Sequence, residues 1–185
     1  RRRPPGAGPA NIAEVRERIR IAAERCGRDP ASLCLVAVGK KHSATALRQA
    51  AAAGQRHFGE NYLQEALEKQ NGLEDLDLCW HFVGPIQGNK TRAIAEHFDW
   101  VHSVDRLRVA RRLSEQRPRE RGDLNVFVQV NISGEASKAG AAVRDVPELV
   151  AAVRALPRLR LRGLMALPAP SPDGAAQKDA FRAVA

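Results

Sequence analysis

Two adjacent lysines, Lys40 and Lys41, have the clearest potential for covalent chemistry in this sequence. They follow Gly39, which ends an apolar run of strand length at residues 33–38. A buried strand that leads to a lysine can place an amine at the mouth of an α/β fold, where it acts as a nucleophile or Schiff-base former. Two solvated loop cations would produce the same pattern, since charged side chains are mostly exposed.

Further candidate side chains lie where other predicted strands end. These residues are Asn61, His81, Ser103, Asn131 and Met165. Each has a structural alternative: Asn61 suits a helix cap, His81 a hydrogen-bonded core and Met165 ordinary packing. The sequence shows no catalytic pair of carboxylates, no Gly-x-Ser-x-Gly turn and no metal-ligand spacing of His, Asp and Glu, so no metal site is predicted.

Strands and helices are predicted to alternate along the chain. The predicted strands span about 33–38, 57–58, 80–83, 100–103, 125–131 and 159–167, and the helices about 11–26, 44–53, 62–69, 90–97, 106–116 and 147–156, with another from about 177. Ser43 and Asp105 are expected to cap two of these helices. This alternation is typical of an α/β protein with parallel strands. Because no Gly-x-Gly-x-x-Gly turn follows the first strand, we predict a TIM (β/α)8-type barrel rather than a Rossmann domain.

The barrel interpretation leaves the chain two strands short. A (β/α)8 barrel has eight strands and usually about 250 residues, whereas this chain of 185 residues provides about six strand–helix units. We therefore expect residues 11–185 to form a single, C-terminally incomplete barrel domain. Residues 1–10, rich in Arg, Pro and Gly, are expected to be a disordered lead-in.

The composition excludes several other classes of protein. The chain is 44% hydrophobic and 28% charged, as in globular proteins, and no apolar run approaches the roughly 20 residues of a membrane span. The net charge of +9 is spread along helices and only 4% of residues are aromatic, which argues against specific nucleic-acid binding. The three cysteines form no CxxC pattern, which favours a reduced, cytoplasmic protein.

Six segments of the chain together resemble the pyridoxal phosphate homeostasis proteins, the single-domain relatives of the alanine racemase barrel. They occur in the order that the family has, at residues 35–40, 53–62, 80–90, 129–132, 136–140 and 162–166. The resemblance implies the barrel of the alanine racemase N-terminal domain, which is the type III fold of proteins that bind pyridoxal 5′-phosphate (PLP). It also implies that two strands, with the loops that hold the phosphate, would follow Ala185, so we expect this chain alone to retain PLP weakly or not at all.

The resemblance also assigns site residues. It implies that Lys40 forms a Schiff base with PLP, because the family's lysine directly follows Ala-Val-Ser, which here reads Ala-Val-Gly. A buried lysine would then condense with the cofactor's aldehyde. Lys41 departs from the family pattern and is a competing acceptor. The resemblance also implies supporting roles at the cofactor for Asn61, His81, Asn131 and Met165. It further implies that Lys138, in a loop, is a secondary acceptor for the aldehyde.

The function implied by the resemblance is that of a non-catalytic carrier and regulator of intracellular PLP, with PLP-dependent apoenzymes as recipients. A PLP-dependent, racemase-like enzyme is the alternative. It needs a second acid or base on the opposite face of the cofactor, and Tyr62 is the single tyrosine of the chain. A basic nucleic-acid-binding module is a third alternative. We expect a monomer that contacts neither membrane nor specific nucleic acid.

Overall fold

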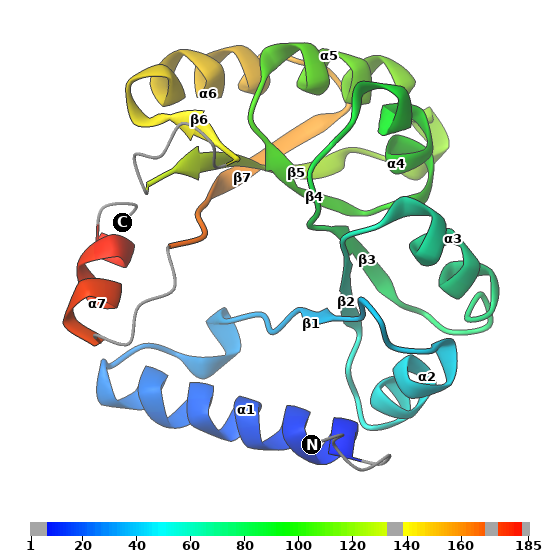
Figure 1. Cartoon of the computed structure of the whole chain (residues 1–185), viewed down its shortest axis with the longest axis vertical. Helices are drawn as coiled ribbons and strands as arrows, with labels where there is room; N and C mark the ends of the chain where they lie inside the picture. Colours follow the sequence, from blue (N-terminus) through cyan, green and yellow to red (C-terminus); the bar gives the residue numbers. More distant parts are fainter. Residues whose placement is uncertain (1–6, 133–138, 169–173, 183–185) are drawn as a thin grey trace. The chain divides into compact units, whose positions relative to one another are not determined.

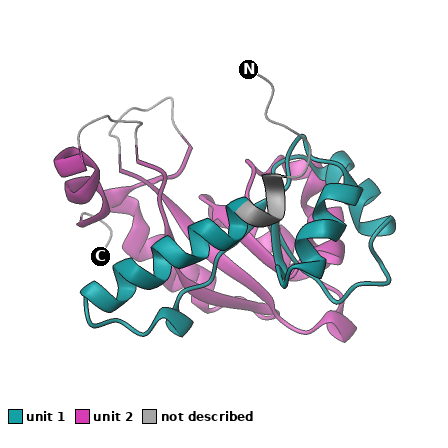
Figure 2. Cartoon of the chain, turned by 90° about the horizontal axis from the view of Figure 1, so that it is seen from below, with its two compact units in different colours: residues 1–81 teal, residues 82–185 magenta. Residues whose placement is uncertain are grey.

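The computed structural model describes residues 7–132, 139–168 and 174–182. The chain divides into two compact units, residues 1–81 and 82–185 (Figure 2). The expectation of a single domain therefore stays a prediction, and Lys138 lies outside the described residues. None of the helices in the described ranges combines the length and the apolar character that crossing a membrane requires.

The first unit alternates helices with strands (Figure 1). Its elements are α1 (Ala7–Arg25), a 3-10 turn (Pro30–Ser32), β1 (Ala37–Val38), α2 (Ala44–Ala52), β2 (His57–Glu60), α3 (Leu63–Asn71) and β3 (Cys79–Phe82), whose last residue belongs to the second unit. β1 and β2 are parallel, with Ala37 opposite Phe58, and β3 is the next strand of the sheet. The buried apolar side chains of this unit include Leu47, Phe58, Ala66, Leu73 and Trp80.

The first strand is shorter and more exposed than predicted. Only the two residues of β1, out of the predicted 33–38, pair with β2. The buried side-chain amide of Gln55 donates to the carbonyls of Leu35 and His57, at 2.8 and 2.7 Å. A side chain therefore bonds these carbonyls where a longer strand would have used backbone amides. Cys34, which we expected in a buried strand, is exposed.

The second unit is built around β5. Its elements are a 3-10 turn (Gly88–Lys90), α4 (Thr91–His97), β4 (Trp100–Val104), α5 (Leu107–Gln116), a 3-10 turn (Arg119–Arg121), β5 (Leu124–Asn131), β6 (Ala141–Ala142), a 3-10 turn (Val143–Asp145), α6 (Val146–Arg154), β7 (Leu159–Met165) and α7 (Gly174–Arg182). β4, β6 and β7 all pair with β5 in parallel, which confirms the predicted α/β class. The two-residue β6 was not predicted. Val101, Val126 and Val128 are fully buried, and α5 and α6 lie against these strands (Figure 1).

The helix starts differ from prediction in part. α1 begins at Ala7, so residues 7–10 of the expected lead-in are helical. Ser43 caps α2 as predicted, with its hydroxyl accepting from the backbone N–H of Ala46 at 3.2 Å. The prediction that Asp105 caps α5 is wrong: the cap residue is Arg106, whose guanidinium donates to the Asp105 carboxylate at 3.0 Å.

A buried arginine closes the end of α4. Arg117 is 4% exposed, and its guanidinium donates to the carbonyls of Ala95 and Phe98 at 2.7 and 2.6 Å. Its Nε atom also donates to the Gly122 carbonyl at 2.9 Å. The last carbonyls of a helix have no partner within the helix, so Arg117 satisfies groups that would otherwise be buried without a hydrogen bond.

Candidate functional site

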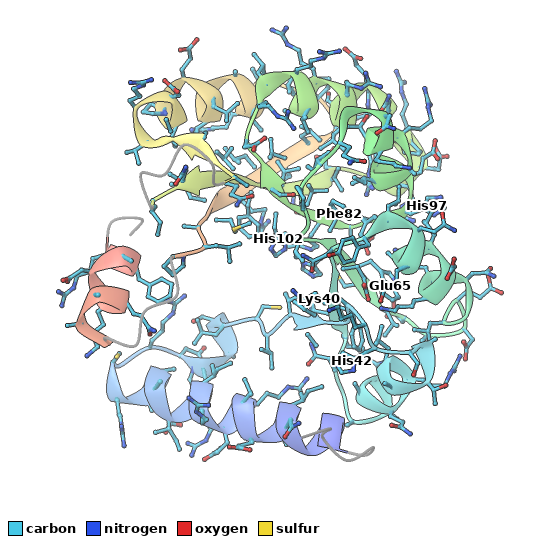
Figure 3. The ribbon with its side chains drawn as sticks, in the orientation of Figure 1. Lys40, His42, Glu65, Phe82, His97 and His102 are labelled. Carbon is cyan, nitrogen blue, oxygen red and sulfur yellow. The ribbon has the colours of Figure 1, made fainter. Side chains whose placement is uncertain are left out.

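The predicted reactive lysine lies on the turn that links β1 to α2. Figure 3 shows Lys40 and His42 on this turn. The backbone N–H of His42 donates to the Gly39 carbonyl at 2.9 Å, and the N–H of Gly39 donates to the Gly59 carbonyl of β2 at 2.8 Å. Lys41 has a φ of 63°, a left-handed conformation that is uncommon outside glycine. The turn therefore has a defined backbone that is tied to the neighbouring strand.

Lys40 is exposed, which corrects the prediction of a buried lysine. The physical reason is the short β1: Val38, two residues earlier, is itself 45% exposed. Within the described part of the chain, the Lys40 amine has no hydrogen-bond or ion-pair partner. An exposed amine that no carboxylate holds is available to an aldehyde from solution.

A second lysine, Lys69 of α3, holds the Lys40 turn from the interior. Lys69 is 5% exposed, and its ammonium group donates to the Gly39 carbonyl at 2.7 Å, to Glu60 Oε1 at 2.9 Å and to Glu65 Oε1 at 2.6 Å. These three contacts use all three of its N–H donors. We call Lys69, Glu60 and Glu65 the Lys69 cluster.

The Lys69 cluster holds the turn at both residues next to Lys40. Glu65, which Figure 3 shows on α3, accepts from the backbone N–H of Lys41 at 2.8 Å, while Lys69 holds the carbonyl of Gly39. The hydrogen bonds from Lys69 and Lys41 keep the pKa of Glu65 below its ordinary value. Both neighbours of Lys40 are thus fixed by charged hydrogen bonds, while its own side chain stays exposed.

Glu60 is the buried carboxylate of the cluster. Its side chain has no exposed surface, and its second oxygen, Oε2, has no hydrogen-bond partner among the described residues. Burial raises the pKa of Glu60, and the ammonium of Lys69 opposes that shift. The carboxylate also explains Gly39, because a Cβ at that position would overlap Glu60 Oε1.

Two other candidates lie in the first unit. Asn61 directly follows β2, so it and Lys40 follow neighbouring parallel strands at the same end. The expectation that Asn61 caps the next helix is wrong, since the cap residue of α3 is Tyr62. His81 is 3% exposed, and its Nε2 lies 2.9 Å from Nδ1 of His57 and 3.5 Å from Sγ of Cys79.

The remaining described candidates lie in the second unit. Asn131 and Met165 are the last residues of the neighbouring parallel strands β5 and β7, and both are half-buried. Ser103 is buried, and its hydroxyl donates to the Gly84 carbonyl at 2.5 Å. Ser103 therefore anchors a loop, whereas Asn131 and Met165 stand at strand ends as predicted.

Sequence reasoning missed the Lys69 cluster and the contact of His57 and Cys79 with His81. A signal existed for part of the first: Glu65 precedes Lys69 by four residues on a helix, the spacing of an ion pair. By itself, that spacing is typical of an ion pair on the solvent-exposed face of a helix. The burial of Glu60, which sets the character of the cluster, depends on how α3 packs against β2.

Comparison with known proteins defines first the class and then the family. The family described as "Alanine racemase, N-terminal domain" matches residues 10–185. The chain therefore has the alanine racemase N-terminal domain fold, as the sequence predicted.

Closer relatives share a narrower description. A protein of Pseudomonas aeruginosa named pyridoxal phosphate homeostasis protein is 64% identical over 171 residues, which are 92% of this chain and 74% of that protein. PipY of Synechococcus elongatus has been solved with PLP bound; it is 42% identical, with a TM-score of 0.73 over 88% of this chain and 74% of PipY. This chain belongs to the family of pyridoxal phosphate homeostasis proteins.

Proposed function

We propose that this chain binds PLP through a Schiff base between Nζ of Lys40 and the aldehyde carbon of the cofactor, and that it acts in PLP homeostasis. The observation that carries the proposal is the exposed Lys40 amine, without a partner among the described residues, on a turn that the Lys69 cluster fixes at both neighbouring residues. The relative with PLP bound and the names of the curated relatives support it.

The chain's own residues position the amine. The Lys69 ammonium and the Glu65 carboxylate hold the backbone around Lys40, which restricts where its amine can reach. Lys69 itself does not compete for an aldehyde, since its three donors are used in the interior. PLP supplies the aldehyde and the electron sink of its ring. Asn61, His81, Asn131 and Met165 are the proposed supporting residues, and Lys138 is the proposed secondary acceptor.

A carrier is favoured over a racemase. Racemisation needs an acid or base on each face of the bound substrate, and the curated relatives have the name of homeostasis proteins rather than of enzymes. We further propose that PLP-dependent apoenzymes in the cytoplasm receive the cofactor and that the chain is a monomer. With PLP and an amino acid in deuterated water, the chain should not exchange the α-proton; exchange would favour the racemase-like alternative.

The test of attachment is the absorbance spectrum with excess PLP. We expect a band at about 420 nm, typical of a protonated Schiff base, in the natural chain. The band should be lost in Lys40→Ala and kept in the matched control Lys41→Ala. A band that survives in Lys40→Ala and disappears in Lys41→Ala would move the attachment to Lys41. No band in any of the three proteins would contradict the proposal for this chain.

A further inference from the structure

Three side chains with metal-binding atoms converge in the first unit. His57 is the first residue of β2, while Cys79 and His81 lie two residues apart on the neighbouring β3. Side chains two apart on a strand point to the same face. The ligand atoms of all three residues lie within 4.8 Å of one another.

Two of the three distances between ligand atoms in this cluster are close to those of a tetrahedral metal site. Bonds of about 2.0–2.1 Å to nitrogen and about 2.3 Å to sulfur place two nitrogen ligands about 3.3 Å apart, and a nitrogen and a sulfur about 3.5 Å apart. Sγ of Cys79 lies 3.5 Å from Nε2 of His81. Nδ1 of His57 lies 2.9 Å from the same nitrogen, so this pair would have to separate by about 0.4 Å.

The donor set selects the kind of metal. One thiolate with two imidazoles suits Zn²⁺, whereas Mg²⁺ and Ca²⁺ prefer oxygen ligands. We propose that His57, Cys79 and His81 form a zinc site with three protein ligands, in which water takes the fourth position. His57, unlike the buried His81, also lines a cavity of about 480 Å³ in the first unit.

Binding requires protons to move in a defined way. The Cys79 thiol loses its proton to solvent, because the thiolate is the ligand. The hydrogen bond between His57 and His81 breaks, and the N–H that donates in it moves to the other nitrogen of the same ring. Both imidazoles then bind in the neutral form. The net exchange is one Zn²⁺ bound and one proton released, with no change of oxidation state.

The test uses the reduced, metal-free chain without PLP, so that it is independent of the proposed cofactor function. Titration with Co²⁺ should saturate at one ion per chain and produce a sulfur-to-cobalt charge-transfer band, which Zn²⁺ should abolish by displacement. Zn²⁺ binding in weak buffer should release about one proton per chain. Cys79→Ser should lose the charge-transfer band. Because even outer-shell changes weaken metal binding about 10- to 100-fold, it should bind Zn²⁺ at least about 100-fold more weakly.

Two further variants keep the test decisive. Cys34→Ser removes an exposed thiol outside the cluster and should leave the titrations unchanged. His57→Gln leaves the Cys79 thiol in place and should weaken Zn²⁺ binding similarly, and thermal melting of both cluster variants separates loss of ligand from loss of fold. Binding that is as strong in folded Cys79→Ser and His57→Gln as in the natural chain would overturn the proposal. So would a band that is lost only in Cys34→Ser.

Discussion

Replacing Lys69 by methionine tests whether the Lys69 cluster holds the Lys40 turn. Methionine keeps an unbranched side chain of similar length but removes the ammonium that contacts Gly39, Glu60 and Glu65. The buried carboxylate of Glu60 then loses its counter-charge while it remains without exposed surface. The substitution should therefore destabilise the chain and loosen the turn beside Lys40.

The expected loss in free energy of unfolding is large because the Glu60 carboxylate, which loses its partner, is buried. Breaking a buried ion pair by removing one partner costs about 3–5 kcal/mol in the free energy of unfolding. That is a decrease of more than about 100-fold in the folding equilibrium constant, and a substantial part of the 5–15 kcal/mol of a typical domain. The lost hydrogen bond to the Gly39 carbonyl acts in the same direction.

The loss of unfolding free energy caused by Lys69→Met should depend on pH. Burial raises the pKa of Glu60 in the folded chain, and removal of Lys69 raises it further. A carboxyl group with a raised folded pKa stabilises the fold below its unfolded pKa, and this contribution is lost as pH rises through the folded pKa. Glu65, whose pKa Lys69 lowers, loses its stabilisation as pH falls. Because of both groups, the difference in free energy of unfolding between the natural chain and Lys69→Met should be smallest in acid and largest near neutral pH.

The measurement is urea unfolding at neutral and acid pH, followed by circular dichroism and by the fluorescence of the two tryptophans, of which Trp80 lies in the core of the same unit. Lys178→Met, at an exposed lysine of α7, is the matched control and should change little. The double variant Lys69→Met with Glu60→Gln should recover much of the loss, because no buried charge remains. A loss below about 1 kcal/mol, or a double variant as unstable as the single one, would refute the reasoning.

Three further predictions concern individual residues. Gly39→Ala places a Cβ against Glu60 Oε1 and should cost about 1–3 kcal/mol by urea unfolding; a neutral effect would show that Glu60 moves freely. Arg117→Lys should cost at least about 2 kcal/mol, since one ammonium cannot reach the carbonyls that the guanidinium spans; full stability in thermal or urea unfolding would contradict this. Burial lowers the pKa of His102, packed on Phe127, to about 4, so its NMR titration midpoint should lie there. Its contribution to stability should be lost as pH falls from about 6.5 through about 4, and a midpoint near 6.5 would contradict this.

The parallel α/β organisation could be predicted because it rests on local signals. The long apolar run of β5 and the serine before α2 are visible in the sequence, and both act over a few residues. The fold assignment also followed from six matching segments, which the family comparison confirms.

The details of the site could not be predicted, because they depend on contacts between distant residues. The carbonyl of Leu35, within the predicted first strand, is bonded instead by the side chain of Gln55, 20 residues away. Lys69 holds the carbonyl of Gly39 across 30 residues. An apolar run followed by lysines predicts a buried strand and a buried amine, and only the packed structure shows that Lys69 is buried and Lys40 is exposed.

Lys40 is proposed as the principal lysine that bonds to PLP, ahead of Lys138 as the secondary acceptor. The most direct test is to incubate the chain with PLP, reduce it with borohydride, digest it and locate the added mass on a peptide. We expect modification chiefly at Lys40, with Lys138 at most a minor site, and none at Lys69, whose amine is held in the interior. Modification chiefly at Lys41 or Lys69, or evenly over the exposed lysines, would contradict this expectation.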